Sequence, residues 1–430
     1  MSRPPLRVAV LGAGTVGRAV IGELVDAPDR LAAHDGRPVA LVGVAARDLA
    51  KAREHGVPGD LLTDAPAHLV AGPDSDVIVE VMGGDEPART LIAAALGAGK
   101  AVVTANKHVV AHHGPELEAI ARRAEAPFRF EAAVAGGIPV LSPLASDLAA
   151  NEITRVRGIV NGTTNHILTA MAQDGRPYAE VLADAQELGY AEADPTGDVE
   201  GDDAVNKLVI LARLAFGAWL DPSTVGRRPP TARGDGAPGI TGVTDQELEG
   251  AAALGLTIKL LASARRATGA DGSADLDGGL EAAVIPTAVP ADSPFGWTDG
   301  VTNRVEIEGR PIGTVRLAGP GAGGAATSSA ILGDLLAVSR GVGSTWAGLA
   351  PATGPASAAV DPLDGPRRWY AFVSDTLDGE LPGLLRGAAT VGFEDGTAVR
   401  TPVATLAEAR AAFTAVLPDG ADVTLYPVDD

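Results

Sequence analysis

Residues 6–17 read LRVAVLGAGTVG, a short apolar run that passes directly into a glycine-rich turn. The run predicts a buried strand over Leu6–Leu11, and the apolar spacing after the turn predicts a helix over Val16–Leu24. A strand, a tight turn and a helix start suit a dinucleotide pyrophosphate, because backbone amides and the helix dipole meet the phosphates there. The residues of this predicted cofactor site are Gly12, Gly14, Thr15, Val16 and Gly17.

Apolar strands that alternate with helices continue through the first 150 residues. Strands are expected at Val39–Ala46, Asp76–Met82, Ala101–Ala105 and Phe128–Ala133, and helices at Glu86–Leu96 and Pro115–Ala124. This alternation predicts an α/β fold with a Rossmann-type, doubly wound parallel sheet. Ligands bind beyond the carboxyl ends of such strands, so we expect Thr104 and Lys107 in the cofactor crevice.

The end of the second strand bears on the identity of the dinucleotide. Arg47 stands where an Asp or Glu would bind the ribose 2'-hydroxyl of NAD. A guanidinium suits a 2'-phosphate, so the sequence favours NADP, with Lys51 as a second contact. Asp48 would disfavour that phosphate, which leaves NAD and a plain surface role for Arg47 open.

Residues 189–207, GYAEADPTGDVEGDDAVNK, gather many carboxylates just before a helix that carries one lysine. The acids are Glu192, Asp194, Asp198, Glu200, Asp202 and Asp203. They indicate either a site for an ammonium-bearing substrate or an ordinary solvated helix entrance. Lys207 follows Asp203 by one helical turn and is placed to exchange a proton with whatever the acids hold. The helix over Ala204–Phe216 is strongly apolar, so Lys207 should lie near the interior.

Composition narrows the class of protein. A chain of 430 residues predicts two or three domains. A net charge of -21 argues against nucleic acid and anionic membranes as partners, which leaves small molecules. No long apolar segment or cleavable leader is evident, so we expect a soluble, cytoplasmic protein. The absence of cysteine excludes disulfides, thiolate zinc sites and thioester chemistry.

The second half of the sequence predicts an architecture different from the parallel sheet of the first 150 residues. Strands are expected at Glu152–Val160, Leu256–Ala264, Glu281–Val289, Val301–Glu308 and Ile312–Leu317. They would form an open sheet in an α+β domain. Asn161–Asn165, NGTTN, opens a helix whose amides could bind a substrate carboxylate or be capped by these side chains. The tail adds strands at Trp369–Val373, Ala388–Phe393 and Val423–Pro427 and a helix at Leu406–Leu417.

Together these segments resemble one family, homoserine dehydrogenase. The matching strings are GAGTVG, TANK at 104–107, EAAVAGGIPV at 131–140, GIVNGTTNHIL at 158–168, AQELGYAEADPTGDVEGDDAVNKLVILA at 185–212 and AGPGAGGAATSSAILGDL at 318–335. The resemblance covers about Val8–Ser339. It implies the NAD(P)-dependent interconversion of L-homoserine and L-aspartate 4-semialdehyde, on the branch towards threonine, methionine and isoleucine.

The resemblance also implies roles for individual residues. Lys207 would donate a proton to the aldehyde oxygen, with Lys107 beside cofactor and substrate. Glu192 and Asp203 would bind substrate and Asp198 would help to hold its amino group, while Gly189 and Gly321 would approach the cofactor. Glu131 and the carbonyls of Val134, Gly136 and Ile138 would form a sodium or potassium site. From the residues alone, this segment is simply a turn. A homodimer, or a tetramer, is expected.

The expected domains are 1–150 for dinucleotide binding, completed by 319–340, then 151–318 for catalysis and dimerisation, and 351–430 as a small C-terminal domain. The last is either a degenerate ACT-like module or a structural appendage, because the usual DRPGVL-type turn is missing. Two other functions stay open: a related oxidoreductase of secondary metabolism that acts on another amino-alcohol, and a catalytically silent dinucleotide sensor.

Overall fold

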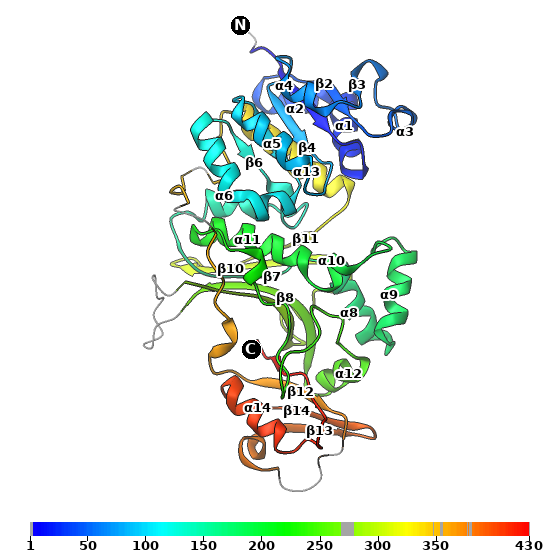
Figure 1. Cartoon of the computed structure of the whole chain (residues 1–430), viewed down its shortest axis with the longest axis vertical. Coiled ribbons are helices and arrows are strands. Elements are labelled where there is room, and N and C mark those ends of the chain that lie inside the picture. The colour runs from blue at the N-terminus through cyan, green and yellow to red at the C-terminus, as the bar shows by residue number, and fades with distance from the viewer. Residues whose placement is uncertain are drawn as a thin grey trace. The chain divides into compact units, whose positions relative to one another are not determined.

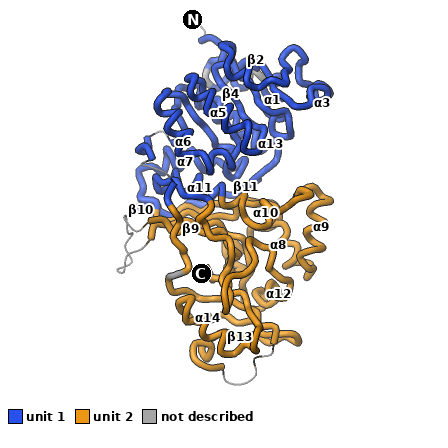
Figure 2. Tube along the Cα trace, viewed as in Figure 1, with its two compact units in different colours: residues 1–153, 206–222, 308–357 blue, residues 154–205, 223–307, 358–430 orange. Residues whose placement is uncertain are grey.

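The computed structural model describes residues 3–267, 279–346, 348–352, 356–375, 377 and 381–429. The chain divides into two compact units, each built from three segments (Figure 2). Unit 1 comprises Met1–Ile153, Asn206–Pro222 and Glu308–Ser357, and unit 2 comprises Thr154–Val205, Ser223–Ile307 and Ala358–Asp430.

Unit 1 is built on a six-stranded parallel sheet in the order β3-β2-β1-β4-β5-β6. Its strands are β1 (Leu6–Leu11), β2 (Val39–Ala45), β3 (Leu62–Thr63), β4 (Val77–Glu80), β5 (Ala101–Thr104) and β6 (Phe128–Arg129). The order reverses direction at β1, which places the loop after β1 at the switch point of the sheet. The predicted doubly wound fold is thereby confirmed.

Helices cover this sheet. They are α1 (Thr15–Asp26), α2 (Pro28–Asp35), α3 (Leu49–Glu54), α4 (Pro66–Ala71), α5 (Ala88–Gly97), α6 (Lys107–Ala124), α7 (Leu141–Ala145) and α13 (Gly324–Ser339), with short 3-10 turns η1 (Gly59–Leu61) and η2 (Glu131–Ala133). Helix α13, from late in the chain, packs against α1 and shares its apolar core (Figure 1). In the described part of the chain, no helix is long and apolar enough to cross a membrane.

Two predicted elements of unit 1 differ from the observed ones by more than two residues at one end. The helix expected to begin at Pro115 begins at Lys107, because the Asn106 side chain caps it and the proline lies inside it. The strand expected over Phe128–Ala133 ends at Arg129. The chain leaves the sheet there because the Glu131 backbone amide donates to the buried carboxylate of Asp334 on α13.

The second sheet has five strands in the order β11-β10-β7-β8-β9. They are β7 (Glu152–Ile159), β8 (Leu256–Arg266), β9 (Leu280–Pro290), β10 (Thr302–Arg310) and β11 (Gly313–Pro320). The accompanying helices are α8 (Gly162–Asp174), α9 (Tyr178–Glu187), α10 (Thr196–Val199), α11 (Asp202–Phe216) and α12 (Asp245–Ala253), with the turn η3 (Pro222–Thr224). The predicted open sheet is therefore present, and β8 pairs antiparallel with both β7 and β9.

The C-terminal part forms a third, four-stranded sheet in the order β13-β14-β12-β15. Its elements are η4 (Pro362–Asp364), β12 (Trp369–Val373), η5 (Gly383–Gly387), β13 (Ala389–Phe393), β14 (Gly396–Arg400), α14 (Leu406–Thr414) and β15 (Tyr426–Pro427). The sequence analysis missed β14, which pairs with both β13 and β12. On the α12 side, a Cβ at Gly250 would lie 2.7 Å from the Phe372 and Tyr370 side chains, so the helix packs closely on this sheet.

Candidate active site

The glycine turn after β1 has a separate steric reason for each glycine. A Cβ at Gly12 would lie 2.6 Å from the Val81 carbonyl oxygen, and one at Gly17 would lie 2.0 Å from that of Gly12. Both positions therefore exclude any side chain. A Cβ at Gly14 would meet no protein atom within 4 Å. The first and third glycines thus build the turn, while the second leaves open space where a pyrophosphate would approach.

Helix α1 starts directly at this opening. Gly14 is its N-cap and provides no side-chain hydrogen bond, so the amides of the first turn keep their capacity to bind an anion. Thr15 is exposed and Val16 is half-buried at this end of the helix. The predicted pyrophosphate residues of the turn therefore surround one unobstructed helix N-terminus.

Arg47 lies at the end of β2, on the same edge of the sheet. Its side chain is exposed and forms no ion pair with any residue that the structure describes. The carboxylate of Asp48 accepts a hydrogen bond from the Lys51 backbone amide at 2.9 Å and caps α3. Asp48, the acid expected to disfavour a 2'-phosphate, therefore caps helix α3.

The ends of β4 and β5 are joined by a buried carboxylate that the sequence analysis did not single out. Glu80 accepts hydrogen bonds from the Thr104 hydroxyl at 2.6 Å and from the Met82 amide at 2.8 Å. Thr104 in turn accepts from the Asn106 amide, and Asn106 caps α6 and donates to the Gly84 carbonyl. Burial raises the pKa of Glu80, against the effect of these hydrogen bonds. The network fixes the start of α6, where half-buried Lys107 is the first residue.

The turn after β6 contains the predicted cation ligands. The carboxylate of Glu131 is buried and accepts hydrogen bonds from the amides of Val140, Leu141 and Ser142 and from the Ser142 hydroxyl. It therefore holds the start of α7 and is not available as a side-chain ligand. Among the described residues, no group donates to the carbonyl oxygens of Val134, Gly136 and Ile138.

The predicted residues Gly136 and Gly321 lie together. A Cβ at Gly136 would be 2.5 Å from the Gly321 carbonyl oxygen, and Gly136 has a positive φ of 50°. The Gly137 amide also donates to the Pro320 carbonyl at 3.1 Å. Gly189, the remaining predicted cofactor residue, lies in unit 2, where it ends α9 with a φ of 75°. For Gly189 the structure by itself gives a helix-ending role.

The acidic segment lies in unit 2, and its carboxylates are used in different ways. Asp194 accepts from the Thr196 hydroxyl at 2.6 Å and from the Thr196 amide, which lowers the pKa of Asp194. Asp202 forms an ion pair with Arg227. Glu192 is exposed and its carboxylate has no partner among the described residues. The segment is therefore no uniform anionic patch.

Asp198 and Asp203 are brought together by a buried amide. The Asn161 side-chain nitrogen donates to Asp198 at 2.7 Å and to Asp203 at 2.8 Å. The Asn161 side-chain oxygen accepts from the Thr164 amide at 2.8 Å and so caps α8. The predicted capping role is confirmed. The bridge between the two carboxylates was not foreseen, because it joins residues far apart in sequence.

Helix α11 carries Asp203 and Lys207 one turn apart, as predicted. Lys207 is 8% exposed, which agrees with the expected position near the interior. Within the described residues, no group of three or more His, Cys, Asp or Glu side chains could hold a metal ion.

Comparison with known proteins gives this arrangement a family. Residues 12–131 match the family model for the homoserine dehydrogenase NAD binding domain, and residues 139–336 match the model for homoserine dehydrogenase. The chain is also 46% identical to homoserine dehydrogenase of Mycobacterium tuberculosis over 336 residues, which is 78% of this chain and 73% of that protein. The chain belongs to the homoserine dehydrogenase family.

Solved homoserine dehydrogenase structures also resemble this fold, one of them over the whole chain. A structure from Thiobacillus denitrificans has a TM-score of 0.87 and 34% identity, and the match covers 100% of this chain and 99% of that one. A hyperthermophilic archaeal homoserine dehydrogenase in complex with NADPH has a TM-score of 0.63 and 26% identity over 78% of this chain and 98% of that one. The family assignment makes the chain an NAD(P)-dependent oxidoreductase.

Proposed function

We propose that the chain interconverts L-homoserine and L-aspartate 4-semialdehyde, with Lys207 as the proton donor in the direction of reduction. The observation that supports this role most directly is the burial of Lys207 on α11, one turn from Asp203. An ammonium group that is shielded from water stabilises a developing negative charge more strongly than an exposed one.

NADPH held at the glycine turn of Gly12, Gly14 and Gly17 would supply a hydride to the aldehyde carbon. As the new C–H bond forms, the carbonyl oxygen gains negative charge and takes a proton from the Lys207 ammonium group. In the direction of oxidation, neutral Lys207 accepts the hydroxyl proton. Lys107, at the start of α6, contributes positive charge beside the cofactor and the substrate.

The substrate's ammonium group requires anionic partners, and we assign these to the acidic segment. Glu192 is suited because it is exposed and its carboxylate is uncommitted. Asp198 and Asp203 are suited because Asn161 orients both. Asp194 and Asp202 are not assigned to the substrate. Asp194 already accepts from Thr196 at the start of α10, and Asp202 forms an ion pair with Arg227.

We further propose NADP as the preferred dinucleotide. Exposed Arg47, without an ion-pair partner among the described residues, is suited to a 2'-phosphate. The commitment of Asp48 to capping α3 removes the main argument against that assignment. Rates with NADP and with NAD at matched concentrations test the preference, and an equal kcat/KM for the two would contradict it.

A monovalent cation is the last proposed component. The backbone carbonyls of Val134, Gly136 and Ile138 fit such an ion, because all three residues are buried and their oxygens accept no hydrogen bond from the described residues. Glu131 would contribute its backbone carbonyl, since its carboxylate is engaged with α7. The cation would hold this turn against the Gly321 loop.

Self-association as a homodimer is proposed from the surface of unit 2. Trp297 is 67% exposed and Val301 is 44% exposed, immediately before β10 of the open sheet. Large apolar side chains that are exposed together mark association surfaces more often than free surface. Light scattering gives the subunit number, and a monomer at micromolar concentration would contradict this proposal.

Replacement of the proposed proton donor tests the mechanism. In Lys207→Met we expect kcat to fall by about 10²–10⁴-fold, because the general acid is lost while the side-chain volume is kept. NADPH binding, followed by fluorescence, should be unchanged. Lys100→Met in the same unit is the control: Lys100 donates to Ser75 and to backbone carbonyls, so its loss should leave kcat intact.

The outcomes separate the competing functions. Normal turnover in Lys207→Met would contradict the proton role. A wild-type protein that binds NADPH but turns over no homoserine would favour the silent sensor. Higher kcat/KM on a longer amino-alcohol than on homoserine would favour an enzyme of secondary metabolism.

A further inference from the structure

Helices α6 and α11 are joined by a buried ion pair that lies away from both lysines. Arg213 on α11 donates to the Glu118 carboxylate on α6 through Nη2 at 2.7 Å and Nε at 3.0 Å. The side chains of Arg213 and Glu118 are 1% and 2% exposed. The contact is bidentate, so it fixes the orientation of the two groups as well as their distance.

Two further donors complete the environment of this carboxylate. The Trp219 indole nitrogen donates to Glu118 at 2.8 Å, and Arg122 on α6 donates to it at 2.9 Å. The indole ring lies so close to α6 that a Cβ at Gly114 would be 2.5 Å from it. Burial by itself would raise the pKa of Glu118, but the hydrogen bonds from Arg213 and Trp219 lower it. Glu118 is thus a buried anion whose donors come from both helices and from the chain after α11.

The same cluster also holds the segment that follows α13. Arg213 donates to the Ala350 carbonyl at 2.8 Å, and Arg122 donates to the Leu349 carbonyl at 2.9 Å. Arg213 further donates to the Gly217 carbonyl at 2.8 Å. Three separate stretches of unit 1 therefore meet at one carboxylate and one guanidinium.

Stability alone does not account for such a pair. A buried ion pair can often be replaced by apolar side chains without loss of stability, since desolvation of both charges offsets their attraction. What apolar side chains cannot supply is the fixed, two-point geometry. The feature to be explained is why α6 and α11 need a fixed register.

The two helices carry the two lysines of the site. Lys107 is the first residue of α6, and Lys207 lies near the start of α11. At about 1.5 Å per residue, the ion pair lies roughly 16 Å along α6 from Lys107 and roughly 9 Å along α11 from Lys207. A change in how the helices cross at Glu118 would be carried along both rigid helices to the lysines.

We propose that Glu118 and Arg213 are positioning residues for the reaction, because their bidentate contact sets the register of α6 and α11 and thereby the positions of Lys107 and Lys207. Trp219 fixes the carboxylate from a third side. The inference rests on the lysine roles proposed above. It adds that these roles depend on a pair of residues that touches neither substrate nor cofactor.

The test is a double variant that removes the charges and keeps the volume. Glu118→Met/Arg213→Met should retain NADPH affinity, because both charges of the pair leave together. Its melting temperature should fall moderately, since Trp219 and the Ala350 and Gly217 carbonyls each lose one partner. We expect kcat to fall by about 10- to 100-fold, since small displacements of catalytic groups have effects of that size. The primary isotope effect on kcat with 4-deuterated NADPH should rise, because the chemical step becomes slower relative to product release.

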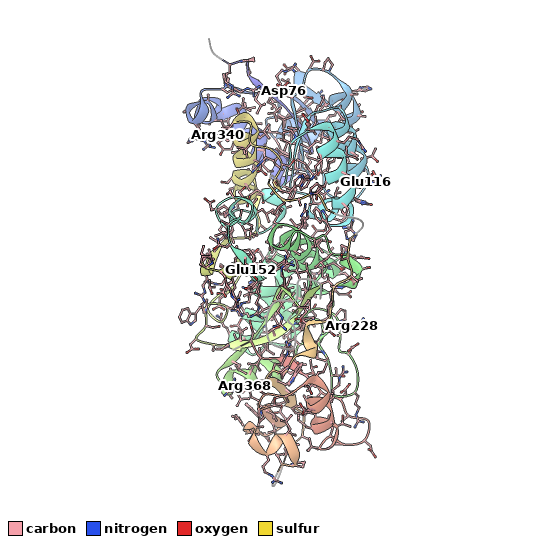
Figure 3. All side chains as sticks on the ribbon, turned by 90° about the vertical axis from the view of Figure 1, so that its left-hand side faces the viewer. Asp76, Glu116, Glu152, Arg228, Arg340 and Arg368 are labelled. Atoms are coloured by element: carbon pink, nitrogen blue, oxygen red, sulfur yellow. The ribbon has the colours of Figure 1, made fainter. Side chains whose placement is uncertain are left out.

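A matched control lies on the same helix. Glu116 lies on α6 (Figure 3). It pairs with Arg89 at 2.7 Å, and the side chains of Arg89 and Glu116 are 33% and 44% exposed. Glu116→Gln should leave kcat and the isotope effect unchanged. The double variant is compared with it below the melting temperature of both proteins.

Wild-type kcat in a folded Glu118→Met/Arg213→Met protein would overturn the proposal. If that variant does not fold, Trp219→Phe replaces it, because it removes the indole N–H donor and keeps an aromatic ring. The smaller ring should lower the melting temperature, but below that temperature kcat should fall several-fold with NADPH affinity unchanged. An unchanged kcat would overturn the proposal. Failure of the lysine roles would be seen separately, as normal turnover in Lys207→Met.

Discussion

The glycine turn of unit 1 and the acidic segment of unit 2 reach function by opposite means. At Gly12 and Gly17 any side chain would collide with backbone, and at Gly14 the space is left open. The absence of side chains at these three positions creates the turn and the open space beside it. In the segment from Gly189 to Asp203 the side chains themselves carry the charge, and their distant partners decide which of them stay available for a ligand.

The difference explains why one region was easier to predict. The turn's requirements are local, because Gly12, Gly14 and Gly17 follow one strand and precede one helix. The acids depend on residues elsewhere in the chain, since Asn161 is 37 residues from Asp198 and 42 from Asp203. Five of the six carboxylates become one acid without a partner among the described residues, a bridged pair and two structural partners only in three dimensions.

The largest effect in this comparison is expected at the third glycine of the turn. Gly17→Ala places a methyl group 2.0 Å from the Gly12 carbonyl oxygen, and the clash is between the backbone at the end of β1 and helix α1. Overpacking of this kind costs about 1–3 kcal/mol, and more where backbone cannot move. We expect the free energy of unfolding, measured by urea titration, to decrease clearly, and NADPH binding to be lost.

The second glycine separates binding from folding. The methyl group of Gly14→Ala would meet no protein atom within 4 Å, so the melting temperature should be that of the wild type. NADPH affinity should fall, because the methyl group would occupy the space left for the pyrophosphate. Gly22→Ala on the same helix is the control, because its nearest contact would be Asp26 at 3.9 Å. It should bind NADPH normally and be slightly more stable. Equal NADPH affinity in Gly14→Ala would remove the steric account of this turn.

A smaller effect is expected in the acidic segment. Asn161→Ala removes the donor shared by Asp198 and Asp203, so the two carboxylates lose their common orientation. We expect the KM for homoserine to rise by about 10-fold, in line with the loss of one well-placed polar contact of about 1.4 kcal/mol. The KM for NADPH should be unchanged.

Loss of a helix cap must be separated from loss of the bridge. Asn161 also caps α8, so part of any effect would come from that helix. Thr405→Ala removes a capping box from α14 in the same unit and serves as the control. It should lower stability by about 1 kcal/mol without a change in KM. A similar KM increase in both variants would show that capping, and not the bridge, is responsible.

The strands and helices show the same division between local and distant causes. The six-stranded parallel sheet was predictable because each strand carries its own apolar run. The end of β6 was not, because it depends on Asp334, which is 203 residues from Glu131. The missed strand Gly396–Arg400 is different: the Asp395–Gly396 pair beside it is a local hairpin signal that could have found it.

The residues of the candidate site also fall into two groups, those marked by local sequence spacing and those that depend on distant partners. The lysines and acids were predictable from motif strings, because their spacing lies within single segments. The residues that orient them were not, since Glu80, Glu118 and Arg213 act through partners on other elements. Glu80 and Arg213 are charged residues within apolar stretches of a strand and a helix, and that pattern could have singled them out. Glu118 lies in a helix with several other charged residues, so nothing local distinguishes it.

The smallest expected effect is a response to pH that has opposite signs in the two regions. Burial raises the pKa of Asp334 to about 6, against the attraction of Arg129. An acid with a raised pKa contributes most stability below its unfolded value, and that contribution is lost as pH rises through about 6. The pKa of Asp194 is lowered by Thr196, so its contribution is present at neutral pH and is lost as pH falls.

Hydrogen exchange, corrected for the intrinsic effect of pH, can measure the two responses in one experiment. Between pH 5 and pH 7, peptides covering 128–142 should lose protection, because Asp334 accepts from the Glu131 amide at 2.9 Å and so holds this turn. Peptides covering 194–203 should not lose protection over the same interval. Asp334→Asn should abolish the dependence in 128–142, since an amide does not titrate. Greater protection of 128–142 at pH 7 than at pH 5 would mean that the ion pair with Arg129 outweighs burial, so that the two regions respond to pH in the same direction.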